Sequence, residues 1–214
     1  MNPEEYNKKQ FEEGLIQPAH LTALAVLWQE KHDLEVDGMC GPQTLASIEE
    51  ELYGESSMLG LQALAIAAES IGKGEVGGNN SGPFVEMLHG KEFDGDDDDD
   101  GNWCAAFISW CSEQACKKMG IQMPFKRSGG AKALYRRISK AGSKVSSPLP
   151  GDVVCWDRGK KGSWQGHIGF VESYQGGILY TIEGNTGRYP SLVRRSQHDL
   201  SRENRLIGFA RMPK

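Results

Sequence analysis

Residues 103–110 read Trp103-Cys104-Ala105-Ala106-Phe107-Ile108-Ser109-Trp110, an apolar run that precedes the strand-forming half of the chain. The sequence predicts a helix over residues 104–119 that starts in this run. Lys117, Lys118 and Gly120 suit its end, because positive charge and glycine are favoured at helix C-termini. The run therefore places a cysteine in the first turn of a helix that should be buried.

The segments on either side predict a change from helices to strands. Further helices are expected around 21–28, 42–52, 58–71 and 131–141, with a short helical piece at 85–88. Beyond Pro150, β-branched and aromatic residues between glycine-rich turns predict strands over 152–156, 167–174, 178–183 and 206–212. Helices followed by strands predict an α+β fold, with helices packed on an antiparallel sheet.

The first part of the chain is expected to form a separate helical module. The turn Asp37-Gly38 lies between two amphipathic patterns, and Pro42 suits the first position of the second helix. The predicted organisation is a module over 1–54, a polar link over 55–57 and a larger domain over 58–214. The module could be any helical hairpin by these criteria alone.

Charge and composition narrow the class of protein. The chain has 214 residues, a net charge of −5 and 38% hydrophobic residues, as a soluble globular protein does. Residues 1–54 carry 11 acidic and 3 basic residues, whereas 55–214 carry 18 and 21, so the larger domain suits an anionic partner. We expect no nucleic acid or membrane partner, a monomer, and synthesis in the cytoplasm, because neither a binding motif, a membrane span nor a signal peptide is evident.

Cys104 is the best candidate for a reactive group. A helix N-terminus favours the thiolate and lowers the pKa of a thiol. The other cysteines are too scattered for a disulfide framework. Cys111, Cys116 and Cys155 are interpreted as small buried apolar residues.

A base and an orienting group are expected from two neighbouring strands. His167 starts the strand G-H-I-G-F-V, in which the flanking glycines leave space beside the imidazole. Glu183 or Asn185, at the end of the next strand, would accept from its second nitrogen and fix the tautomer. In this order on a helix and adjacent strands, the residues predict a papain-like arrangement.

Two resemblances sharpen these expectations. Residues 18–54, with L-W-Q at 27–29, L-E-V-D-G at 34–38 and G-P-Q-T-L at 41–45, resemble the peptidoglycan-binding domain of cell-wall hydrolases. Residues 58–212 resemble the CHAP family of cysteine, histidine-dependent amidohydrolases and peptidases. The matching motifs are G-G-N-N-S-G-P at 77–83, W-C-A-A-F-I-S-W at 103–110, P-G-D-V-V-C-W at 150–156, G-H-I-G-F-V at 166–171 and E-G-N at 183–185.

The second resemblance implies a peptidoglycan hydrolase that cleaves an amide bond of the wall peptide. Cys104 would be the nucleophile, His167 the base and Glu183 the orienting group, while Asn185 would position the imidazole or polarise the carbonyl. No cofactor is needed for this chemistry. N-acetylmuramoyl-L-alanine amidase and endopeptidase remain alternatives, as do a non-catalytic wall-binding protein and a cysteine peptidase or transpeptidase acting on protein. Without a signal peptide, the chain would act after release, as a phage endolysin does, with a bacterial enzyme exported by a dedicated system as the alternative.

Two further groups of residues are assigned to the site. Asp96, Asp98 and Asp100, followed by Gly101, match the start of a calcium loop, and some CHAP enzymes hold calcium just before the nucleophile. The run predicts a structural calcium ion, with a solvated acidic loop as the alternative. Trp103 and Trp156 are predicted to line the substrate cleft, with packing in the core as the alternative.

Overall fold

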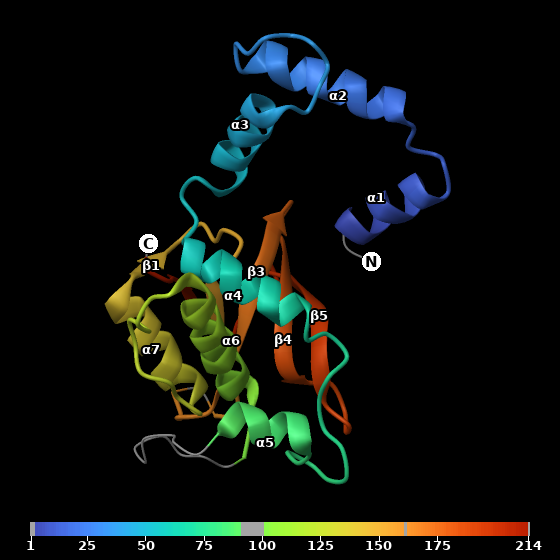
Figure 1. The fold of residues 1–214 in the computed structure, drawn as a ribbon. Helices are drawn as coiled ribbons and strands as arrows, with labels where there is room; N and C mark the ends of the chain where they lie inside the picture. The colour runs from blue at the N-terminus through green and yellow to red at the C-terminus, as the bar shows by residue number, and fades with distance from the viewer. Residues whose placement is uncertain (1–2, 91–100, 161, 214) are drawn as a thin grey trace. The chain divides into compact units, whose positions relative to one another are not determined.

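A computed structural model describes residues 3–90, 101–160 and 162–213, and divides the chain into two compact units, Met1–Glu55 and Ser56–Lys214 (Figure 1). Asp96, Asp98 and Asp100 lie outside the described residues. Among the described helices, none combines the length and hydrophobicity that crossing a bilayer requires.

The first unit consists of α1 (Pro3–Glu12), α2 (Pro18–Lys31) and α3 (Pro42–Tyr53). Gln29 on α2 is only 1% exposed, and its amide ties the helix to the turn that follows. Nε2 donates to Asp37 Oδ1, Met39 O and Thr44 Oγ1 at 2.8–3.0 Å, while Oε1 accepts from the Gly38 amide at 2.9 Å. The motif residues of this unit are therefore used to hold α2, the turn and α3 together.

The apolar residues of α2 are less buried than their periodicity predicts. Leu21 and Leu24 are 45% and 61% exposed, whereas Ala25 is buried. Leu45 on α3 is also 47% exposed. Helices α2 and α3 form as expected, and the hydrogen bonds of Gln29 help to hold them together.

The second unit packs helices on one antiparallel sheet, so the predicted α+β fold is confirmed. Its helices are α4 (Met58–Ala68), α5 (Pro83–His89), α6 (Cys104–Met119) and α7 (Ala131–Ala141). Its strands, in the spatial order β1-β6-β2-β3-β4-β5, are β1 (Ser143–Val145), β6 (Leu206–Arg211), β2 (Val153–Asp157), β3 (Gly166–Gln175), β4 (Ile178–Thr186) and β5 (Leu192–Asp199). Helices α4 and α6 pack together against β3 and β4, and α7 packs against β2, β3 and β6 (Figure 1).

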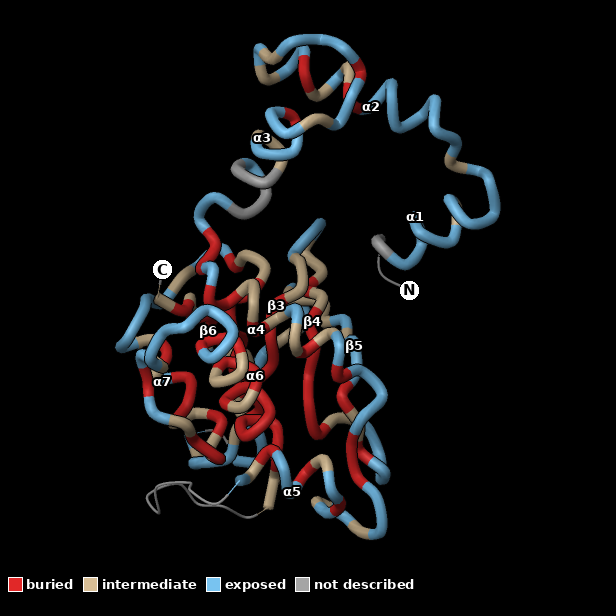
Figure 2. The backbone as a smooth tube through the Cα atoms, viewed as in Figure 1, coloured by how far each residue is buried: buried red, intermediate tan, exposed pale blue. Residues whose placement is uncertain are grey.

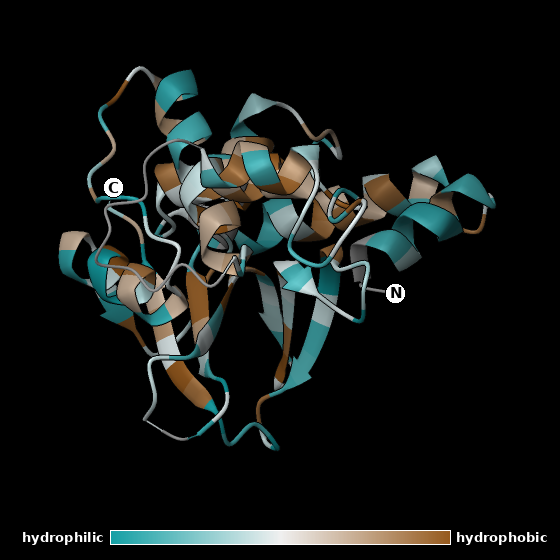
Figure 3. Cartoon of the chain, turned by 90° about the horizontal axis from the view of Figure 1, so that it is seen from below, coloured by the Kyte–Doolittle hydropathy of each residue, from teal (hydrophilic) through white to brown (hydrophobic). Residues whose placement is uncertain are grey.

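Residues alternate between the two faces of the sheet along each strand, and both faces bury apolar side chains. Val153 and Cys155 on β2 face the large core beneath the helices, while Val154 and Trp156 belong to a smaller cluster with Phe209. Figures 2 and 3 show the buried and the apolar residues gathered where the helices meet the sheet.

The predicted link over residues 55–57 is only partly a link. Ser57 is 1% exposed, accepts a hydrogen bond from the Gly60 amide as the N-cap of α4, and donates to the carbonyl of Pro213. Ser56 is also buried, and the second compact unit starts there.

Candidate active site

Cys104 is the first residue of α6, and it is 3% exposed. The first part of this helix is buried on several sides, and its buried residues include Phe107 and Ile108. Its N-cap, Trp103, makes no side-chain capping hydrogen bond. Because the first backbone N–H groups of a helix have no partner within it, the sulfur lies at an electropositive end.

A buried carboxylate that sequence reasoning missed holds the start of α6. Glu75 is 3% exposed and accepts hydrogen bonds from Trp103 Nε1 at 3.2 Å, the Asn80 amide at 2.9 Å and the Ser191 amide at 2.7 Å. Burial raises the pKa of Glu75, but these donors together lower it below its usual value. No motif around residue 75 reveals this role, because two of the three donors, Trp103 and Ser191, come from distant segments.

The predicted base and Glu183 lie on neighbouring strands and are in contact. His167 Nε2 is 2.7 Å from Glu183 Oε2, and the two residues are 5% and 2% exposed. Gly169 makes this contact possible, because a Cβ there would lie 2.6 Å from Glu183 Cγ. The carboxylate thus occupies the space that the glycine leaves beside the imidazole.

The electrostatics join His167 to the thiol. With Nε2 engaged by Glu183, Nδ1 is left for Cys104, and no other described group competes for it. Burial opposes a thiolate at Cys104, but the imidazole of His167, the charge of Arg158 and the Ile168 amide outweigh burial. They lower the pKa of the thiol below its usual 9.0.

The imidazole and the carboxylate shift in the complementary directions. Burial lowers the pKa of His167, but hydrogen bonds and charge from Cys104 and Glu183 raise it to about 9. Burial raises the pKa of Glu183, whereas its imidazole partners hold it well below the usual range. The pKa of the Cys104 thiol is lowered and that of the His167 imidazole is raised, so the favoured state is a thiolate beside an imidazolium.

Asn185 lies close to the site but does not contact the imidazole through any described hydrogen bond. Its Nδ2 donates to Asn102 Oδ1 at 3.2 Å, two residues before the thiol. The β4–β5 register shifts between Glu183 and Thr186, and Asn185 has a φ of +57°, which asparagine tolerates better than most residues. Of the two candidates for orienting His167, Glu183 has the required geometry.

The expectation for Trp103 is wrong. This side chain is 0% exposed, lies in the large core and donates its N–H to Glu75, so it cannot line a cleft. Trp156 is 5% exposed and stacks on the His167 ring with centroids 5.8 Å apart. It is absent from the residues that line the cavity at the thiol, so it supports the imidazole from within the fold.

A cavity of about 300 Å³ opens at Cys104. The exposed side chains of Arg158 and Trp164 border it, and Trp164 is the tryptophan that sequence reasoning missed as a cleft residue. The complete lining is Asn102, Cys104, Gly129, Gly130, Ala131, Arg158, Gly159, Trp164, Gln165 and Gly166.

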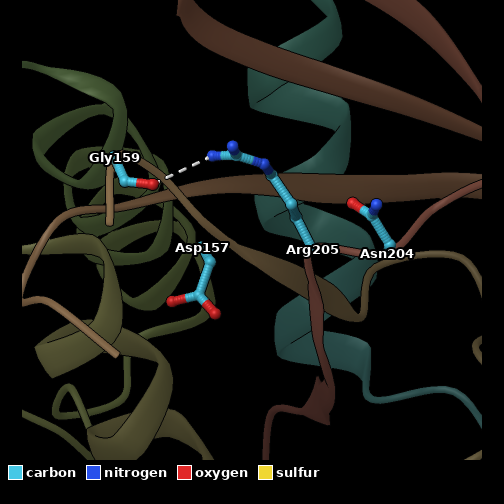
Figure 4. Close-up of a pocket in the computed structure, with 4 residues that line it drawn as sticks. All are labelled: Asp157, Gly159, Asn204 and Arg205. Carbon is cyan, nitrogen blue, oxygen red and sulfur yellow. Dashed lines mark hydrogen bonds between the residues drawn. The ribbon is translucent and has the colours of Figure 1, made fainter. Parts of the chain in front are cut away.

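A second cavity of about 290 Å³ shares Gly159 with the first and is lined by Asp157, Gly159, Asn204 and Arg205 (Figure 4). The Arg205 guanidinium donates to the Gly159 carbonyl at 3.2 Å. The lining of this second cavity includes no thiol or imidazole, so the candidate chemistry belongs to the cavity at Cys104. Within the described residues, no group of three or more metal-ligating side chains is suitably placed for a metal ion.

Comparison with known families agrees with this geometry. Residues 96–185 match the sequence profile of the CHAP domain. This part of the chain is similar to CHAP domains. Cys104, His167, Glu183 and Asn185 all fall within it. No curated protein has significant sequence similarity to the chain.

Two solved structures have some likeness to the chain: Ly7917 with the hydrolyzing product of MDP, and Ly7917. Both are 18% identical, with TM-scores of 0.45 and 0.44, over 74% and 71% of this chain. The chain spans 63% and 61% of the length of those two chains.

Proposed function

We propose that this chain is a peptidoglycan hydrolase that cleaves an amide bond of the wall peptide through the Cys104 thiol. The observation that carries the proposal is the contact of His167 with Glu183, together with the Cys104 thiol whose pKa His167 lowers, at a cavity and within the residues that match the CHAP profile. Peptidoglycan is proposed as the substrate because of the family resemblance, since a thiol of this kind could attack any accessible amide.

The mechanism follows from the geometry as acyl transfer. The Cys104 thiolate attacks the carbonyl carbon, and the imidazolium of His167 gives its proton to the departing amine as the C–N bond breaks. A thioester forms on the sulfur. Water then attacks the thioester while His167 accepts its proton, and the acid product leaves with the thiolate restored.

The other site residues support these steps. Glu183 stabilises the imidazolium and keeps its Nδ1 for the sulfur. Backbone N–H groups at the start of α6 would stabilise the oxyanion, because they converge on the sulfur's helix terminus. Asn185 acts through Asn102, which lines the cavity beside the thiol.

Clearing of purified cell walls tests the proposal. We expect the full-length protein to lower the turbidity of a suspension of purified sacculi, and protein treated with iodoacetamide to leave it unchanged. A wall-binding protein without activity would sediment with the sacculi and never clear them. Cleavage of casein without clearing of sacculi would instead indicate a peptidase acting on protein.

We also propose that the first unit binds the wall. Its resemblance to peptidoglycan-binding domains supports this role, although Gln29, Asp37 and Thr44 are used for folding. We expect residues 56–214 alone to fold, since both apolar cores lie within them, and to sediment less with insoluble sacculi than the full chain. Cleavage of soluble wall fragments should persist; equal sedimentation of both proteins would contradict the binding role.

The calcium ion and the endolysin-like role stay predictions. The aspartates of the acidic run lie outside the described residues, so no geometry of a cation site is derived. The amidase and endopeptidase alternatives share every step above, because both break an amide through the same thiol.

A further inference from the structure

The carboxylate of Glu183 has a second imidazole partner. His198 on β5 places Nε2 2.6 Å from Glu183 Oε1, the oxygen that also accepts a hydrogen bond from Thr181. The side chain of His198 is 24% exposed, so water reaches it more readily than the buried His167. This histidine lies beyond residues 96–185, the part that matches the CHAP profile.

An indole ring connects the two histidines. The centroid of Trp156 lies 4.6 Å from that of His198 and 5.8 Å from that of His167. Because Trp156 is 5% exposed, its ring is held by the small core on this face of the sheet. The indole therefore limits the tilt of both imidazoles.

The two oxygens of Glu183 have different tasks as a result. Oε1 is engaged by Thr181 and His198, which leaves Oε2 for His167. A carboxylate held at one oxygen cannot rotate freely, so its other oxygen stays directed at the catalytic imidazole. We propose that His198 is a positioning residue of the catalytic centre, which orients Glu183 and through it the tautomer of His167.

The position of Glu183 should then affect the thiol. A carboxylate held by His198 keeps its charge on the His167 imidazolium, and the imidazolium favours the thiolate of Cys104. Loss of the hydrogen bond from His198 should therefore lower the reactivity of Cys104.

His198 contacts the charged group Glu183 on β4, and His167 on β3 lies across the indole of Trp156. Arg194 lies opposite Glu183 in the β4–β5 register, but it is exposed and its guanidinium lies near Gly187. Asp199, next on the strand, bonds to Ser201 and pairs with Arg202.

Alkylation of Cys104 by iodoacetamide, followed by peptide mass mapping across pH, tests the inference in the full chain. His198→Phe keeps a ring beside Trp156 but removes the donor, and should slow alkylation at neutral pH on the order of tenfold. His198→Gln keeps a donor for Glu183, so it should retain most of the rate and the wild-type pH profile of alkylation. Arg195→Gln, on the same strand and paired with Glu172, is the control and should match wild type.

Wild-type rates and pH profile in a folded His198→Phe variant would overturn the proposal. If that variant does not fold, His198→Ala tests the same loss of the donor, and a wild-type rate and pH profile there would equally contradict a role for His198. The inference rests on the proposed thiol chemistry, but alkylation reads the sulfur without any wall substrate. Failure to clear sacculi would remove the proposed function and leave the alkylation result standing.

Discussion

Replacing Cys104 with alanine is expected to abolish wall hydrolysis, with a loss of activity on the order of a thousandfold or more. The sulfur forms the covalent bond to the acyl group, and no other side chain in the cavity can replace it. The rate of release of soluble wall fragments measures the effect, with thermal unfolding as the check that the variant folds.

The other cysteines supply matched controls. Cys111 lies on the same helix and is buried, and burial raises the pKa of its thiol well above the usual value. Burial likewise raises the pKa of Cys155 to about 12. Cys111→Ala and Cys155→Ala should therefore retain hydrolysis per folded molecule; retained activity in Cys104→Ala would refute the assigned nucleophile.

Glu183→Gln is expected to lower activity on the order of a hundredfold or more, because the imidazolium loses its buried counter-charge. The wild-type pKa of His167 is about 9, so wild-type activity should fall as the pH rises through that value and the proton donor is lost. In the variant the alkaline fall should move toward the usual pKa of 6.5. A pH–rate profile of soluble-fragment cleavage measures both effects.

The same shifts predict how stability depends on pH. The raised pKa of His167 contributes stability that is complete below 6.5 and is lost as the pH rises through about 9. The depressed pKa of Glu183 contributes stability above its usual 4.5, lost in acid. Glu183→Gln should flatten both dependences in thermal unfolding.

A second buried carboxylate gives the control for Glu183. Asp152 is 0% exposed and pairs with Arg211 at 2.9 Å, within the fold and outside the cavity at the thiol. Asp152→Asn should lower stability without moving the pH–rate profile. If Glu183→Gln keeps the wild-type profile and rate, the carboxylate has no part in the chemistry.

The order of helices and strands could be predicted because it depends on local pattern. Helix α6 and strand β3 have long apolar runs with clear ends, whereas β5 is rich in charged and polar residues and was not predicted. Strand β1 has three residues, too few for a period to show. Helix α1 also escaped prediction, since its sequence is polar and lacks an apolar stripe.

Only the site residues that lie in a recognisable sequence motif could be predicted. Cys104 and His167 stand in recognisable motifs, and Glu183 follows at the end of the next strand. His198 and Glu75 act through partners far along the chain, and a strand register or a loop contact of that kind leaves no local signal. Trp103 was misassigned because the sequence gives its position beside the nucleophile and not the direction of its ring.

Mass spectrometry of the fragments released from purified sacculi tests the central claim most directly. The account predicts soluble products that carry a new free amine and a new carboxylate from one class of amide bond, with none from Cys104→Ala. The identity of that amide would also distinguish amidase from endopeptidase. Products with new reducing ends and intact amides, or the same products from Cys104→Ala, would contradict amide hydrolysis by the Cys104 thiol.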